Sequence, residues 1–177
     1  MTGTTRPASP QSPLTALVPV GDTLHAVAER TYRAPRADVW AAWTEPDRLA
    51  RWLGTPSGDL APGGAYRLVL GDGEDELVTG TVLACEPPAR LVATWVLPDG
   101  SSSEVEVTFD EHADGTLLRL EHRGLPANQT RGYAAGWHVY ADDLGALLAG
   151  ERPAGTWEER FDAVLPTYLE AEPTPRS

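Results

Sequence analysis

The strongest restriction on the fold comes from five short segments of alternating hydrophobicity, which are followed by one long amphipathic segment. The five segments occupy residues 66–121, and in the clearest of them Val105, Val107 and Phe109 alternate with polar residues. This alternation predicts strands with one buried face and one solvated face. Turn sequences recur at spacings of about 8–12 residues, so an antiparallel meander is expected.

Six strands are predicted in total, together with two short helices that follow the first strand. The helices are expected within Asp38–Glu45 and 46–53, where apolar residues change from a period of two to helical spacing. The acidic sequence Gly71–Glu76 is interpreted as a turn. The predicted strands are Leu24–Ala34, Tyr66–Leu70, Leu77–Cys85, Arg90–Leu97, Ser102–Glu111 and Thr116–Glu121.

Two further helices are predicted after the strands. The longer one runs from Pro126 to about Leu148 and ends at Gly150, and the last begins at Thr156, which has capping-box spacing to Glu159. Glycine costs roughly 1 kcal/mol relative to alanine inside a helix. The three glycines of the long helix therefore indicate close backbone approach or space left open, at Gly132, Gly136 and Gly145.

A single domain is predicted over residues 23–170, between a flexible N-terminal extension (1–22) and a C-terminal tail (171–177). Within the extension, Leu14–Val20 is expected to pack along the edge of the domain. Prolines interrupt each apolar run there, which argues against a secretory signal, and no run approaches the ~20 apolar residues of a membrane span. We therefore expect a cytoplasmic protein without membrane insertion.

The charged residues exclude several classes of function. The chain has 14 basic residues, all of them arginine, against 26 acidic residues, and its formal net charge is −12. This balance argues against binding to nucleic acids or anionic membranes. The absence of lysine excludes a Schiff base, and a single cysteine excludes an intrachain disulfide. The four histidines lack metal-ligand spacing, so no metal site is predicted. There is no GxSxG motif and no basic residue near Cys85, so no catalytic residue is predicted, and no cofactor is expected.

The predicted order of elements fits an α+β fold in which a curved antiparallel sheet of six strands wraps around the long helix. A curved sheet and a straight helix do not meet along their whole length, so a cavity is expected between them. His122 is interpreted either as a hydrogen-bonded core residue or as a contact to the ligand. The candidate lining residues are Tyr66, Trp95, Val107, Phe109, Leu120, His122, Tyr133, Trp137 and Tyr140.

Four stretches in the same order resemble the activator of heat-shock-protein-90 ATPase homologue family, which belongs to the SRPBCC (START-like, helix-grip) superfamily. The resemblance covers about residues 24–150. It is carried by TYRAPRADVWAAWTEPDRLARWLG (Thr31–Gly54), PPARLVATWVLPDG (Pro87–Gly100), SEVEVTFDEHADGTLLRLEHRGLP (Ser103–Pro126) and GWHVYADDLGALLAG (Gly136–Gly150). The chain resembles the uncharacterised bacterial members of this group.

The resemblance implies a helix-grip fold with a cavity between the sheet and the long C-terminal helix. Members of the superfamily bind lipids, sterols, polyketides or plant hormones, and a minority catalyse reactions in the cavity. The first hypothesis is therefore a protein that binds a small apolar molecule without catalysis. The alternatives are a cyclase or hydrolase that uses His122 and a tyrosine, and a co-chaperone or interaction module with Trp157 and Phe161 on its last helix. The sequence also leaves a homodimer open.

Overall fold

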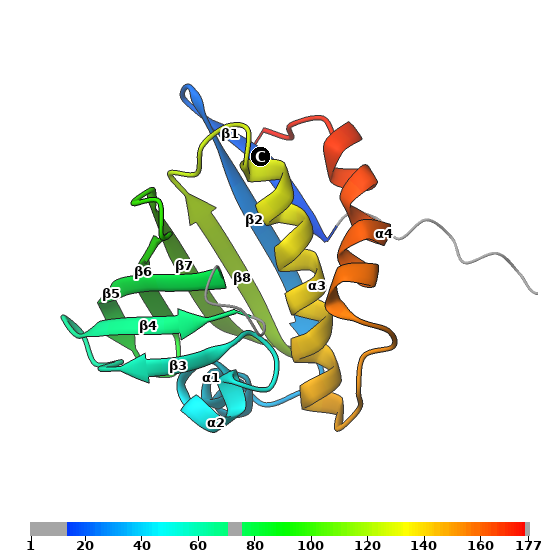
Figure 1. Ribbon diagram of the computed structural model, residues 1–177. Helices are drawn as coiled ribbons and strands as arrows, with labels where there is room; N and C mark the ends of the chain where they lie inside the picture. The colour runs from blue at the N-terminus through cyan, green and yellow to red at the C-terminus, as the bar shows by residue number, and fades with distance from the viewer. Residues whose placement is uncertain (1–13, 71–75, 176–177) are drawn as a thin grey trace, which may run out of the picture.

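The structure is a computed structural model that describes residues 14–70 and 76–175. One antiparallel sheet of eight strands has the order β1-β2-β8-β7-β6-β5-β4-β3 (Figure 1). The α+β class and the antiparallel sheet are confirmed, whereas the predicted number of six strands is wrong. The strands are β1 (Thr15–Val20), β2 (Thr23–Tyr32), β3 (Thr55–Gly58), β4 (Ala65–Val69), β5 (Leu77–Glu86), β6 (Arg90–Val96), β7 (Ser102–His112) and β8 (Gly115–Arg123).

The two strands missing from the prediction are the two edges of the sheet. β1 pairs with β2 and buries Leu17, so residues 15–20 form an edge strand in the stretch that was expected to pack along the edge of the domain. The tail lies against this strand, since the backbone N–H of Thr174 donates to the carbonyl of Leu17 at 2.8 Å. β3 has only four residues and contains Pro56, which a strand tolerates at an edge. Residues 71–75 of the predicted acidic turn lie outside the described residues.

Four helices complete the described part of the chain: α1 (Arg36–Thr44), α2 (Pro46–Leu49), α3 (Thr130–Ala149) and α4 (Trp157–Glu170). α3 begins four residues after the predicted start, because Pro126 to Gln129 form a hydrogen-bonded turn instead. α3 ends at Gly150, whose φ of 71° is readily adopted by glycine. α4 begins with the predicted capping box, in which Thr156 and Glu159 each accept a backbone N–H from the other.

The sheet bends around a core that the helices cover from two directions (Figure 1). α3 packs along β2 and β1, and α1 lies against β7 and β8 at one end of the sheet. Between them, Trp43 of α1 stacks on Trp137 of α3 with ring centroids 6.4 Å apart, and Phe109 of β7 contacts Trp43 edge-on. α4 packs beside α3, and its Tyr168 also contacts β1 (Figure 1).

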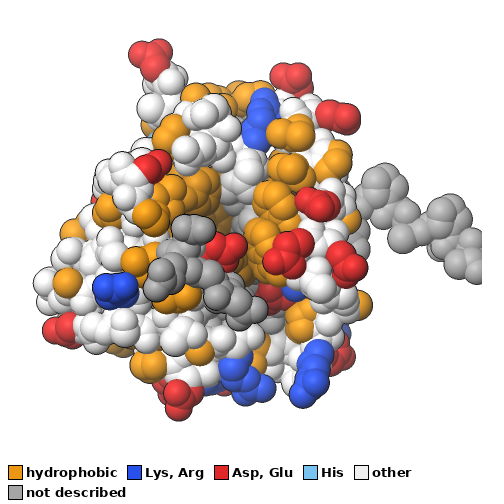
Figure 2. All heavy atoms as spheres, in the orientation of Figure 1, with side chains coloured by type: hydrophobic (Ala, Val, Ile, Leu, Met, Phe, Trp, Pro, Cys, Tyr) orange, Lys and Arg blue, Asp and Glu red, His pale blue; other side chains and the backbone are white. Residues whose placement is uncertain are grey.

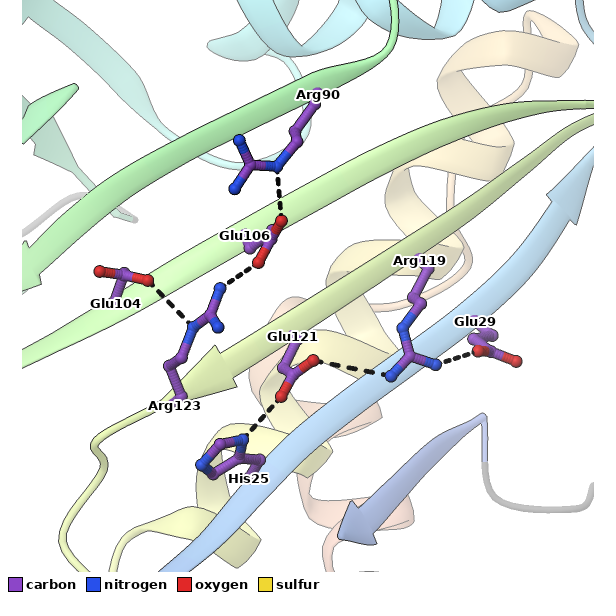
Figure 3. Close-up of polar contacts among 8 residues, drawn as sticks. All are labelled: His25, Glu29, Arg90, Glu104, Glu106, Arg119, Glu121 and Arg123. Atoms are coloured by element: carbon purple, nitrogen blue, oxygen red, sulfur yellow. Dashed lines mark hydrogen bonds and ion pairs between the residues drawn. The ribbon is translucent and has the colours of Figure 1, made fainter. Parts of the chain in front are cut away.

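The opposite face of the sheet carries the charged residues that alternate with the core. Glu106 of β7 accepts hydrogen bonds from Arg90 of β6 and Arg123 of β8 (Figure 3). Glu121 of β8 contacts His25 of β2, with 2.6 Å between the carboxylate and Nδ1. The Glu106 pairs join neighbouring strands on the solvated face, in agreement with the alternation in the sequence, whereas His25 and Glu121 are buried.

Candidate functional site

A cleft of about 670 Å³ lies between the sheet and the two C-terminal helices. Figure 2 shows the molecule hollowed between these parts, with hydrophobic side chains on both sides of the hollow. The volume falls within the roughly 300–1,000 Å³ of typical ligand sites. Seven aromatic side chains line the cleft: Trp52, Trp95, Tyr133, Trp137, Tyr140, Trp157 and Phe161.

α3 supplies one long wall of the cleft. Tyr133, Trp137 and Tyr140 follow one another at spacings of four and three residues, which places them on one side of the helix. Gly132 and Gly136 lie among them and also line the cleft. A Cβ atom at position 132 would meet no atom within 4 Å, so this glycine leaves open space, as its high cost inside a helix predicted.

α4 supplies a second aromatic wall. The rings of Trp157 and Phe161 stack with centroids 4.9 Å apart, and Trp157 also contacts Tyr140 of α3 at 5.4 Å. An ion pair between Arg160 and Asp143, 2.6 Å apart, fixes this half of α4 on α3. The aromatic residues of the last helix therefore pack on their own domain and border the cleft.

The charged residues of the cleft are few and mostly acidic. Arg51, Glu76 and Glu158 contribute the charges, and Figure 2 shows acidic side chains beside the hollow. Burial raises the pKa of the Tyr140 hydroxyl, and the charge of Glu76 raises it further. Burial also raises the pKa of Tyr133. Both phenols are therefore neutral near pH 7 and offer hydroxyl groups rather than charge.

A second, smaller pocket of about 200 Å³ lies among α1, α2 and strands β3 to β7. We call it the inner pocket. Tyr66 lines it, and the Tyr66 hydroxyl donates to the carbonyl of Thr94 at 2.5 Å. Burial raises the pKa of Tyr66 to about 12. The hydroxyl is thus neutral and already has a partner within the protein.

The nine candidate residues do not line a single cavity. Trp95, Tyr133, Trp137 and Tyr140 line the cleft, whereas Tyr66, Trp95 and Val107 line the inner pocket. Within the described residues, the remaining three line neither of these cavities, because they are packed in the core under α1 and α3: Phe109, Leu120 and His122.

His122 is a hydrogen-bonded core residue. Its side chain is fully buried, Nδ1 accepts from the indole Nε1–H of Trp137, and Nε2 lies 2.8 Å from the Ser103 hydroxyl. Burial lowers the pKa of His122 to about 3. A histidine with both ring nitrogens occupied and no access to either cavity does not fit the role of a general acid or base.

Several cleft residues were not predicted from the sequence. Trp52 and Leu53 follow α2, and Trp157 and Phe161 begin α4. The signals for α4 were the capping box and the helical spacing of Trp157, Phe161, Leu165 and Tyr168. That pattern indicates a buried helical face, but it does not say which surface the face covers.

No group of three or more His, Cys, Asp or Glu side chains among the described residues could hold a metal ion. No helix in residues 14–70 and 76–175 has both the length and the hydrophobicity needed to cross a membrane.

Known proteins share both sequence and fold with this chain. CalU16 from Micromonospora echinospora is 34% identical over 88% of this chain and 95% of its own crystal structure, with a TM-score of 0.67. DynU16, a protein from the dynemicin biosynthetic locus, is 26% identical over 75% of this chain and 49% of its own, with a TM-score of 0.66. An uncharacterised protein of Schizosaccharomyces pombe is 33% identical over 103 residues, and the chain spans only 29% of its length.

A family match agrees with these similarities. Residues 33–149 match the family described as activator of Hsp90 ATPase homolog 1-like protein. This range includes both short helices, strands β3 to β8 and all of α3. The related structures have the SRPBCC helix-grip fold, as the sequence resemblance implied. The chain therefore belongs to the family of activator of Hsp90 ATPase homolog 1-like proteins.

Proposed function

We propose that this protein binds a small, mostly hydrophobic molecule in the cleft between the sheet and α3 and α4. The observation that carries the proposal is a cleft of about 670 Å³ with seven aromatic side chains in its lining. Burying apolar ligand surface contributes about 25 cal/mol per Å², and aromatic walls add favourable ring contacts. DynU16, which comes from a biosynthetic locus, supports a connection with small molecules.

The lining also restricts the charge of the ligand. Glu76 and Glu158 give the cleft more negative than positive charge, since Arg51 is its one basic residue among those described. The net charge of the chain is −12, which adds repulsion for anions. A neutral or cationic ligand fits this environment better than a fatty acid or another carboxylate.

The two alternatives lack comparable support. An enzyme of the cyclase or hydrolase type would need an accessible base, but His122 is buried with both ring nitrogens bonded. A docking helix would need a free aromatic face, but Trp157 and Phe161 stack on each other and border the cleft. Ligand carriage remains the function that the geometry favours.

The experiment is a fluorescence titration with N-phenyl-1-naphthylamine, a neutral aromatic probe. We expect saturable enhancement with a Kd below about 100 µM, which corresponds to a modest affinity per atom. Gly132→Leu should abolish binding, because the new side chain fills open space in the cleft. Ala149→Leu is the matched control, since it adds the same side chain at the exposed end of the same helix.

Each result has a clear meaning. Binding by the wild type and Ala149→Leu, together with loss in Gly132→Leu, supports the cleft as the ligand site. Equal binding by all three proteins would place the probe elsewhere and overturn the proposal. Circular dichroism and the unfolding temperature must show that Gly132→Leu is folded. If it is not, Gly136→Ala provides a smaller obstruction, because a Cβ there lies 3.9 Å from the Trp157 ring, an ordinary contact distance.

A further inference from the structure

The cleft and the inner pocket are neighbours that share two residues. Leu53 and Trp95 line both cavities, and both side chains are otherwise buried. Trp95 lies one residue before the end of β6, and its ring meets Trp137 edge-on at 5.5 Å. The indole of Trp95 and the side chain of Leu53 therefore form the partition between the two spaces.

Within the described residues, ring contacts rather than a hydrogen bond of good geometry hold the Trp95 ring in this position. The indole N–H of Trp52 donates to the carbonyl of Ala42, and that of Trp137 donates to His122. The buried Nε1 of Trp95 has no such acceptor in the described structure. The Tyr133 hydroxyl interacts with the Trp95 indole N–H, although this contact falls short of good hydrogen-bond geometry. Rotation of Trp95 therefore breaks its ring contacts and its contact with the Tyr133 hydroxyl.

The inner pocket is lined mainly by apolar side chains. Its two hydroxyl-bearing residues have partners within the protein, because Tyr66 donates to Thr94 and Thr44 donates to the carbonyl of Trp40. Apolar cavities of about 150 Å³ stay dry and bind benzene or xenon. The inner pocket is slightly larger and has apolar walls that include Leu49, Leu68, Val82, Leu91, Val105 and Val107.

We propose that the inner pocket is a second binding subsite, which takes a compact hydrocarbon group of a ligand whose larger part lies in the cleft. The group has the size of a benzene ring or a short alkyl chain, and it passes Trp95 when the indole turns aside. This inference rests on the proposed function, because the cleft must hold the rest of the ligand.

The test compares naphthalene with 2-butylnaphthalene in displacing N-phenyl-1-naphthylamine. Each buried methylene group contributes about fourfold in affinity, so a butyl chain that enters the inner pocket should improve binding at least tenfold. Ala93→Leu fills the inner pocket from β6 and should remove most of this gain while leaving naphthalene unchanged. Cys85→Leu, on β5, is a second variant with the same expected effect.

The outcomes separate this inference from the proposed function. If naphthalene competes but the butyl chain adds no affinity, or if the gain persists in Ala93→Leu and Cys85→Leu, the second subsite is wrong and the cleft stands. If neither compound nor the probe binds, the proposed function itself fails. Should both variants fail to fold, methyl NMR of the wild type decides the matter. Butyl-specific shifts at Val82 and Val107 are expected, and shifts confined to cleft residues would overturn the subsite.

Discussion

The indole Nε1–H of Trp137 donates to Nδ1 of His122 across 3.1 Å, and this bond determines where the histidine proton resides. An indole can only donate, so Nδ1 must be unprotonated and the neutral ring carries its proton on Nε2. Nε2–H then donates to the Ser103 hydroxyl, which donates to the carbonyl of Trp95 at 3.1 Å. Three successive hydrogen bonds thus connect α3 to β8, β7 and β6 behind the cleft.

The burial of neutral His122 predicts a specific loss of stability in acid. The pKa of His122 is about 3 in the folded protein and about 6.5 in the unfolded chain, so the unfolded state binds the proton first. The free energy of unfolding is unaffected above pH 6.5 and falls as the pH decreases from 6.5 towards 3. At pH 4.5 the loss from this residue is about 2–3 kcal/mol.

Urea unfolding of the wild type and His122→Gln at pH 7.5 and 4.5 measures this effect. Glutamine can accept from Trp137 and donate to Ser103, but it does not titrate. The wild type should lose about 2–3 kcal/mol more than the variant between the two pH values. Equal losses would mean that His122 is not held neutral.

The sequence was sufficient to predict the faces of the central strands and the class of fold. Val105, Val107 and Phe109 are buried on β7 as their alternation indicated. A strand with one buried face needs apolar residues at every second position, so the pattern identifies that face. The two edge strands could not be predicted from such a pattern. β1 lies in a proline-containing stretch, and β3 has four residues with only Pro56 partly buried, so neither presents a run of alternating hydrophobicity.

The site was predictable only in part, because a local sequence pattern does not show how distant segments pack together. Periodicity assigned Trp137 and Tyr140 to the inner side of the long helix, but it could not show that Trp95 divides the interior into two cavities. Nor could it place α4, whose position depends on contacts between residues far apart in the chain. Tyr168 contacts Thr15 and His138, and no local pattern encodes either pair.

Tyr168 should make a large contribution to the attachment of α4. Its hydroxyl accepts the backbone N–H of Thr15 at 3.1 Å and lies 2.7 Å from Nδ1 of His138, and the side chain is fully buried. Tyr168→Phe leaves both partners buried without it, so we expect a loss of about 2 kcal/mol. Urea unfolding measures this loss, and amide exchange at Thr15 should accelerate. Leu169→Ala, at an exposed neighbouring position, should change stability by less than about 0.5 kcal/mol.

Gly132→Ala should stabilise the protein. A Cβ at this position meets no atom within 4 Å, so the substitution gains helix propensity without a clash. We expect about 0.5–1 kcal/mol of added stability and an increase in Tm of about 1–4 °C. Gly150→Ala should have the opposite sign, because its φ of 71° is strained for alanine. A destabilised Gly132→Ala would show that the helix needs glycine there for another reason.

Glu106 should contribute more than its neighbour Glu104 on the outer face of the sheet. Burial opposes ionisation of Glu106, but hydrogen bonds from Arg90 and Arg123 outweigh this effect and lower its pKa (Figure 3). Its stabilisation is therefore present above the unfolded pKa of about 4.3 and is lost as the pH falls through the lower, folded value.

Substitution by glutamine at the two positions distinguishes their contributions. Because the arginines are about one-third exposed, we expect Glu106→Gln to cost about 0.5–1.5 kcal/mol at pH 7. Glu104 pairs with Arg123 alone among the described residues, so Glu104→Gln should cost less. Urea unfolding at 0.1 and 1 M NaCl measures both, and the difference should shrink at high salt because the ion pairs are partly screened. A larger cost for Glu104→Gln would contradict the bridging role of Glu106 between β6 and β8.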